Sequence, residues 1–148
     1  MATTTIKTPD TAQHVSQEEL SLVRSYLLLT FIHKVFERDC RVIGQSGLFK
    51  TPQLYMEMIS GGAKKTAVML QEVKRELDSH KLRITTITQD VHGVEAKYSC
   101  RSIPGELNIQ WPGFRREMML RMRAYLGLAT EFSIVSRDEH VEQLSLSL

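Results

Sequence analysis

The chain has 148 residues, of which 42% are hydrophobic and 24% charged, and its formal net charge is +2. This composition is ordinary for a soluble globular protein, and the length predicts a single domain. The two cysteines, Cys40 and Cys100, are far apart and neither lies in a CxxC motif. That spacing excludes a disulfide framework and a zinc pattern, so we expect a reducing, cytoplasmic environment.

The ends of the chain differ in character from its middle. Residues 1–14 are polar and rich in threonine, so we expect a flexible segment and no secretion signal. Residues 15–135 are expected to form one globular domain, and residues 136–148 a flexible acidic tail. The longest apolar run, residues 20–36, is interrupted by charged side chains, so we expect no membrane span. The basic middle of the chain is compatible with a nucleic-acid surface.

A long helix is expected first. Ser16 and Glu19 form a capping-box pattern ahead of it, and apolar residues then recur at helical spacing to about Arg38. The apolar face is broad, which predicts either burial on two sides or pairing with a second chain. The expected homodimer interface consists of Leu20, Val23, Leu27 and Phe31. After the helix, Arg41–Gly44 could form a short strand.

The stretch from residue 51 to residue 80 predicts two helices. Thr51 suits an N-cap and Pro52 the first helical position. Gly61 and Gly62 are expected to end this first helix, because glycine weakens a helix interior. The second helix then runs from 63 to 79. Its expected buried face consists of Thr66, Leu70, Val73 and Leu77.

Alternating residues over 82–87 and 94–101 predict two strands, and residues 89–93 a loop in which Gly93 has a positive φ. A tight turn is expected at Pro104–Gly105, followed by a third strand that ends near Trp111. A last helix is expected from residue 114, with Gly127 just past its end. A further strand-like run is residues 131–135.

This order of elements resembles a winged helix-turn-helix: a helix, a break, a second helix and a β-hairpin. The resulting fold class is α+β, with a long N-terminal helix, a helix-turn-helix, a three-stranded antiparallel meander and a C-terminal helix. The resemblance implies a regulator-type protein that inserts the helix 63–79 into the major groove of duplex DNA. The expected nucleic-acid-binding residues are Lys64, Lys65, Thr66, Gln71, Arg83, Lys97, Arg101, Arg115 and Arg116.

Two other readings use the same elements. From residue 63 to 128 the order helix, three strands, helix also resembles the double-stranded RNA-binding domain, in which Arg115 and Arg116 would occupy the phosphate-contacting end of the last helix. Alternatively, the chain is a protein-interaction module without nucleic acid. The broad apolar first helix and the acids within the helix 63–79 favour this reading: Glu72, Glu76 and Asp78.

No motif indicates catalysis or a cofactor. The chain contains no GxGxxG, GxxxxGK[ST], HExxH or GxSxG motif. The five histidines are scattered, and none lies at metal-ligand spacing from another histidine or a cysteine. We therefore expect a protein that is not an enzyme and that uses no cofactor and no metal ion.

Overall fold

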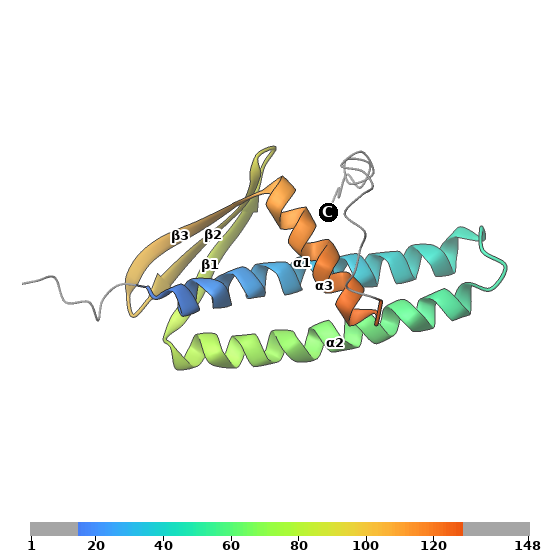
Figure 1. Cartoon of the computed structure of the whole chain (residues 1–148), viewed down its shortest axis with the longest axis horizontal. Helices are drawn as coiled ribbons and strands as arrows, with labels where there is room; N and C mark the ends of the chain where they lie inside the picture. The colour runs from blue at the N-terminus through green and yellow to red at the C-terminus, as the bar shows by residue number, and fades with distance from the viewer. Residues whose placement is uncertain (1–14, 129–148) are drawn as a thin grey trace, which may run out of the picture.

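The computed structural model describes residues 15–128. Its elements are α1 (Gln17–Ser46), α2 (Pro52–Ser79), β1 (Leu82–Gln89), β2 (Gly93–Cys100), β3 (Ile103–Gln110) and α3 (Trp111–Tyr125). Figure 1 shows α1 and α2 side by side as an antiparallel hairpin, with the sheet at one end of it and α3 running from the sheet towards the middle of the hairpin. The expected α+β class is therefore confirmed. The predictions for residues 1–14, 131–135 and 136–148 lie outside the described residues.

Helix α1 begins as its sequence predicts and continues further. The Ser16 hydroxyl accepts a hydrogen bond from the Glu19 backbone N–H at 3.1 Å, and the Glu19 carboxylate accepts one from the Ser16 N–H at 3.1 Å. These reciprocal bonds form the predicted capping box. The helix ends only at Gly47, whose φ of 69° is left-handed. The strand predicted at Arg41–Gly44 is wrong, because those residues continue the helix.

Helix α2 is continuous across Gly61 and Gly62, so the predicted break between two helices is wrong. Gly62 lies where three helices meet. A Cβ atom there would be 2.9 Å from Leu126 Cδ2 and 3.0 Å from Phe36 Cε2. The glycine therefore permits close packing, and that packing outweighs a helix-propensity cost of about 1 kcal/mol. Within residues 15–128 there is thus no helix-turn-helix at this position.

The three strands form the predicted antiparallel meander, in the order β1-β2-β3. The positive φ predicted for Gly93 and the turn predicted at Pro104–Gly105 are both wrong. Gly93 does not have a positive φ; instead, a Cβ there would lie 2.0 Å from the Ile109 carbonyl oxygen on β3. The second turn lies at Arg101–Ser102, whose φ values are 48° and 69°. Gly105 belongs to β3 and pairs with Tyr98, whose ring covers it.

Helix α1 lies at the centre of the core, buried by α2 on one side and by the sheet and α3 on the other. The ring of Phe31 packs edge-on against those of Trp111 and Phe114, with centroid distances of 6.4 and 5.1 Å. This position accounts for the broad apolar face of α1. It also corrects the expected dimer interface: Val23, Leu27 and Phe31 are buried within the chain and Leu20 is partly buried. The homodimer itself stays a prediction.

Candidate functional site

The end of the helical hairpin that lies beyond the sheet and α3 is the candidate functional site (Figure 1). It comprises residues 37–61, the last turns of α1, the connecting loop and the first turns of α2, and we call it the distal arm. The last buried residue of α1 is Phe36, and the first of α2 is Gly62. No residue of the distal arm is buried. Two helices alone cannot enclose a core, so their outer faces remain exposed.

Contacts inside the distal arm are few. The Cys40 thiol donates a hydrogen bond of 3.7 Å to the Met56 carbonyl, and Gly44 leaves room for the Met56 side chain. Phe49 and Tyr55 lie with ring centroids 5.5 Å apart. The large apolar side chains exposed on the arm are Val42, Leu48, Phe49, Leu54, Tyr55 and Met58. They are distributed over the end of α1, the connecting loop and the start of α2.

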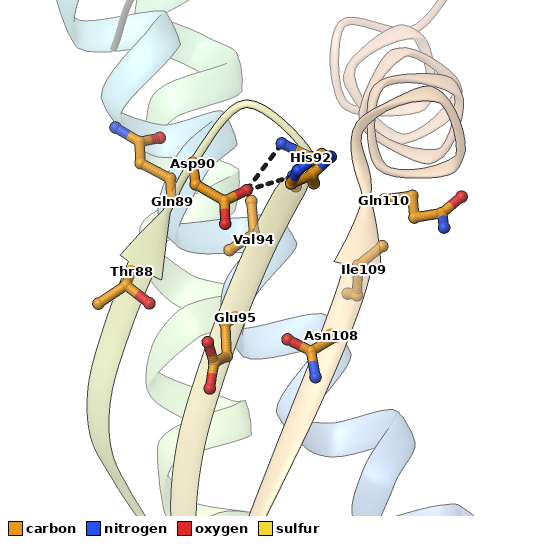
Figure 2. A pocket seen from close by; sticks show the side chains of 10 residues that line it. Thr88, Gln89, Asp90, His92, Val94, Glu95, Asn108, Ile109 and Gln110 are labelled. Atoms are coloured by element: carbon orange, nitrogen blue, oxygen red, sulfur yellow. Dashed lines mark hydrogen bonds between the residues drawn. The ribbon is translucent and has the colours of Figure 1, made fainter.

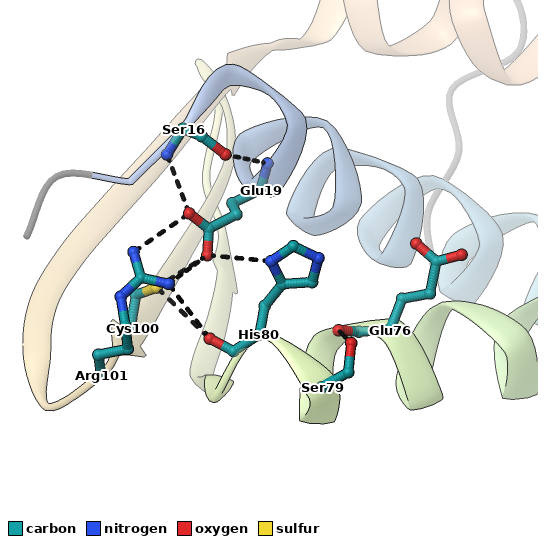
Figure 3. A network of polar contacts seen from close by, with 7 residues as sticks. All are labelled: Ser16, Glu19, Glu76, Ser79, His80, Cys100 and Arg101. Atoms are coloured by element: carbon teal, nitrogen blue, oxygen red, sulfur yellow. Dashed lines mark hydrogen bonds and ion pairs between the residues drawn. The ribbon is translucent and has the colours of Figure 1, made fainter. Parts of the chain in front are cut away.

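A polar cluster lies at the opposite end of the hairpin, around the buried carboxylate of Glu19 (Figure 3). Arg101 donates two hydrogen bonds to it, from Nη1 at 2.8 Å and from Nη2 at 3.2 Å. The Cys100 thiol donates a third at 3.2 Å, and His80 Nδ1 lies 3.5 Å from the same oxygen. The cluster thereby links the start of α1 to the α2–β1 and β2–β3 turns.

The combination of Cys100, His80 and Glu19 has the residue types of a nucleophilic site but not the electrostatics. Burial raises the pKa of the Cys100 thiol, and its hydrogen bond to Glu19 raises it further. A thiol held protonated is a poor nucleophile. The Arg101 guanidinium holds the pKa of the Glu19 carboxyl well below its usual value, against the opposing effect of burial. We therefore interpret the cluster as a structural clamp.

A hollow of about 450 Å³ lies on the sheet near the β1–β2 turn (Figure 2). Its lining is mostly polar and includes Asp90, His92, Glu95 and Asn108. The Asp90 carboxylate accepts hydrogen bonds from the backbone N–H groups of His92 and Gly93, at 2.7 and 3.0 Å. These two bonds lower the pKa of Asp90 and commit it to the turn. The lining shows no pair of nucleophile and base in hydrogen-bond contact.

Two of the residues predicted to bind nucleic acid have internal roles. Thr66 is fully buried, which corrects its predicted role: its hydroxyl donates to the Ala63 carbonyl at 2.7 Å and lies 2.9 Å from His33 Nδ1. Arg101 is engaged by Glu19. The buried Thr66 hydroxyl cannot contact a phosphate, and the Arg101 guanidinium already pairs with a carboxylate.

The remaining predicted residues lie on different faces. Arg83 and Lys97 are exposed, on the face of the sheet opposite the buried Ala96 and Tyr98. Lys64 and Gln71 are exposed on α2, and the Lys65 ammonium donates to the Tyr125 carbonyl at 3.2 Å.

On α3, the Arg115 guanidinium lies 5.5 Å from the centre of the Trp111 ring, and Arg116 is exposed. The structure thus brings Lys65 to the end of α3. Arg83 and Lys97 lie elsewhere, on the face of the sheet turned away from the helices.

Sequence reasoning missed the distal arm because the glycine pair suggested that α2 began at residue 63. A usable signal was present. Leu54, Met58 and Val68 recur at helical spacing on both sides of Gly61. A periodicity that keeps its phase across a glycine predicts one helix.

Two features are absent from residues 15–128. No described helix has both the length and the apolar character needed to cross a bilayer. In the same residues, no group of three or more His, Cys, Asp or Glu side chains is arranged to hold a metal ion.

Comparison with known proteins gives one match. A family model described as "YhjD protein" matches residues 14–130, which include every helix and strand of the structure. No curated protein matches the chain, and no solved structure matches it. Because the family model spans most of the chain, the chain belongs to the YhjD protein family.

Proposed function

We propose that this protein is a non-enzymatic protein-interaction module that presents the distal arm to a partner. One observation carries the proposal: residues 37–61 contain no buried residue, yet they expose several large apolar side chains. Exposed apolar surface of this kind costs free energy in water and is favourably covered by another protein. The base of the molecule, formed by residues 15–36 and 62–128, would hold the arm in place.

The charges of the distal arm support a protein partner. Its acidic residues are Glu37, Asp39 and Glu57, and its basic residues are Arg38, Arg41 and Lys50. These charges balance, so the arm has no excess positive charge with which to attract a nucleic acid. An apolar surface with mixed charges at its edges is typical of protein interfaces.

Binding of duplex DNA through a winged helix-turn-helix is the alternative proposal, and binding of double-stranded RNA a weaker one. The RNA alternative depends on Arg115 and Arg116 at the start of the last helix. The DNA alternative depends on Lys64 and Lys65. In a recognition helix these residues lie at the helix N-terminus, which attracts phosphate. Lys64 and Lys65 instead lie in the middle of α2, which begins at Pro52. The alternative therefore lacks the contribution of a helix terminus.

The experiment compares two positions of a photo-crosslinking amino acid, p-benzoylphenylalanine, in the full chain. One replaces Phe49 on the distal arm, and the control replaces Thr88, which is exposed on the sheet. We expect protein adducts after irradiation in cell extract from position 49 and none from position 88. Changing the neighbouring Leu48 to Ser should reduce the yield at position 49 severalfold, because apolar contact is lost.

Retardation of duplex DNA or duplex RNA is measured alongside, at low and high salt. Adducts that depend on Leu48 support the interaction module. If position 49 gives no more adduct than position 88, the proposal fails. If duplex DNA is bound at low salt and Lys64→Glu with Lys65→Glu abolishes that binding, the DNA alternative replaces it.

A further inference from the structure

An apolar seam runs along the exposed face of α2, from the distal arm into the base. Leu54, Met58, Gly61, Lys65 and Val68 follow one another at spacings of four and three residues, which places them on one helix face. The exposed fractions of Leu54, Met58 and Val68 are 64%, 50% and 58%. Gly61 and Lys65 are exposed as well. We call these five residues the α2 seam.

Gly61, at the centre of the α2 seam, has no role within the described chain. A Cβ atom at this position would meet no atom within 4 Å, and its φ is not positive. Neither space nor backbone conformation therefore calls for glycine, which in a helix interior costs about 1 kcal/mol relative to alanine. Glycine at such a position lets a second backbone approach closely. The partner of this face is therefore expected to be another helix.

The two ends of the α2 seam are symmetric about Gly61. Leu54 lies seven residues before it and Val68 seven residues after it. If two copies of α2 cross antiparallel with a two-fold axis at Gly61, Leu54 of each copy faces Val68 of the other. Lys65 is the one basic residue of the α2 seam. Its ammonium is turned away from the contact between the two helices, because it donates to the Tyr125 carbonyl at 3.2 Å. Its aliphatic stem remains in the seam.

Charges beside the α2 seam are complementary under the same symmetry. Glu57 and Lys64 are seven residues apart and so project from the same flank of α2, one before and one after Gly61. Neither makes an ion pair within residues 15–128. In the antiparallel arrangement each Glu57 lies within one residue, about 1.5 Å along the helix axis, of the level of Lys64 of the second copy. Side chains of this length can therefore form two equivalent ion pairs.

We propose that the α2 seam binds a second copy of this chain, with two α2 helices crossing antiparallel at Gly61. This inference rests on the proposed function, because it names the partner for one face of α2 that begins in the distal arm. It differs from the dimer interface expected on α1, whose residues lie in the core. The geometry combines a close crossing at Gly61, apolar contacts between Leu54 and Val68, and ion pairs between Glu57 and Lys64.

The first test is sedimentation of the full chain over a range of concentrations. We expect a reversible dimer, and we expect Gly61→Leu to weaken it at least about tenfold, because the added side chain separates the helices. Glu57→Lys and Lys64→Glu should each weaken it, since each places like charges opposite one another. The double variant, Glu57→Lys with Lys64→Glu, should restore association. Lys74→Glu on the opposite face of α2 is the control.

The second test replaces Val68 with p-benzoylphenylalanine. We expect an adduct at twice the mass of the 16.9 kDa chain. A monomeric wild type, a dimer insensitive to Gly61→Leu, or a double variant no better than the single ones would each overturn the inference. So would an adduct within one chain or with a different protein. If sedimentation shows a monomer while position 49 still gives Leu48-dependent adducts, the inference fails and the proposed function stands.

Discussion

The base and the distal arm contrast in how they bury apolar side chains, although both are made from the same two helices. In the base, α1 is covered by α2, the sheet and α3, and side chains such as Leu27, Ile32 and Phe114 are fully enclosed. Among the described residues, the arm consists of parts of α1 and α2 and their connecting loop, and none of its residues is buried. In the base many apolar side chains are covered by folding, although some, such as Val68 and Leu120, stay exposed. In the arm folding buries none of them.

The largest expected difference comes from removing one phenylalanine in each region. Phe114 is fully buried against Phe31 and Trp111, whereas Phe49 is 43% exposed. We expect Phe114→Ala to lower the free energy of unfolding by about 3–5 kcal/mol, because it leaves a cavity. Phe49→Ala should lower it by less than about 1 kcal/mol. Urea unfolding, followed by circular dichroism, measures both.

The comparison is sharpened by combining this measurement with cross-linking from p-benzoylphenylalanine at position 48 of the arm, which lies outside the α2 seam. Phe49→Ala should reduce adduct formation there while leaving the fold stable, which would separate binding from folding. Equal destabilisation by the two variants would mean that the arm contributes to folding as the base does, and the contrast between the two regions would be lost.

A smaller effect is expected at the polar cluster of the base. Glu19→Gln retains the size of the side chain but removes the charge that Arg101, Cys100 and His80 surround. We expect a loss of about 2 kcal/mol at neutral pH, typical of hydrogen bonds to a charged group. A matched charge removal in the arm, Glu57→Gln, should change the stability of the monomer by less than about 0.5 kcal/mol, because Glu57 is exposed.

The effect at Glu19 should depend on pH in one direction. Arg101 holds the pKa of Glu19 below its usual value in the folded state, against burial, which raises it. The carboxylate therefore contributes stability that is fully present above an unfolded pKa of about 4.3 and is lost as pH falls towards the lowered folded value. The difference between wild type and Glu19→Gln should be constant above about pH 5 and shrink below about pH 4. A difference that grows on acidification would contradict this assignment.

Local patterns in the sequence predicted the elements whose cause is local. The Ser16–Glu19 capping box starts α1 as expected, because its hydrogen bonds join residues three positions apart. The strands β1 and β2 follow the alternation of the sequence, and their pairing is the predicted meander. The buried face of α2 contains Thr66 and Leu77, as its periodicity indicates. Each of these features can be predicted from residues that lie close together in the sequence.

The errors occurred where a glycine was explained by its backbone rather than by what packs against it. Gly62, Gly93 and Gly105 are each close to a side chain or backbone of another element. The positive φ values of the second turn belong instead to Arg101 and Ser102. Such contacts join residues far apart in the sequence, so no local pattern reveals them. The same error hid the candidate site, because the distal arm can be recognised only if α2 is one continuous helix.

The smallest effect, and the most direct test of the contrast, lies between the adjacent residues Gly61 and Gly62. Alanine at either position should favour the helical backbone of α2 by up to about 1 kcal/mol. At Gly61 the new methyl group meets no atom within 4 Å, so Gly61→Ala should stabilise a dilute, monomeric sample. At Gly62 it would lie 3.0 Å from Phe36 Cε2 and 2.9 Å from Leu126 Cδ2, so Gly62→Ala should destabilise the protein by about 1 kcal/mol. Thermal unfolding at low concentration should therefore show changes of opposite sign. If both variants unfold at a higher temperature than the wild type, position 62 is not tightly packed. The boundary between base and arm then lies further along α2, towards residue 66.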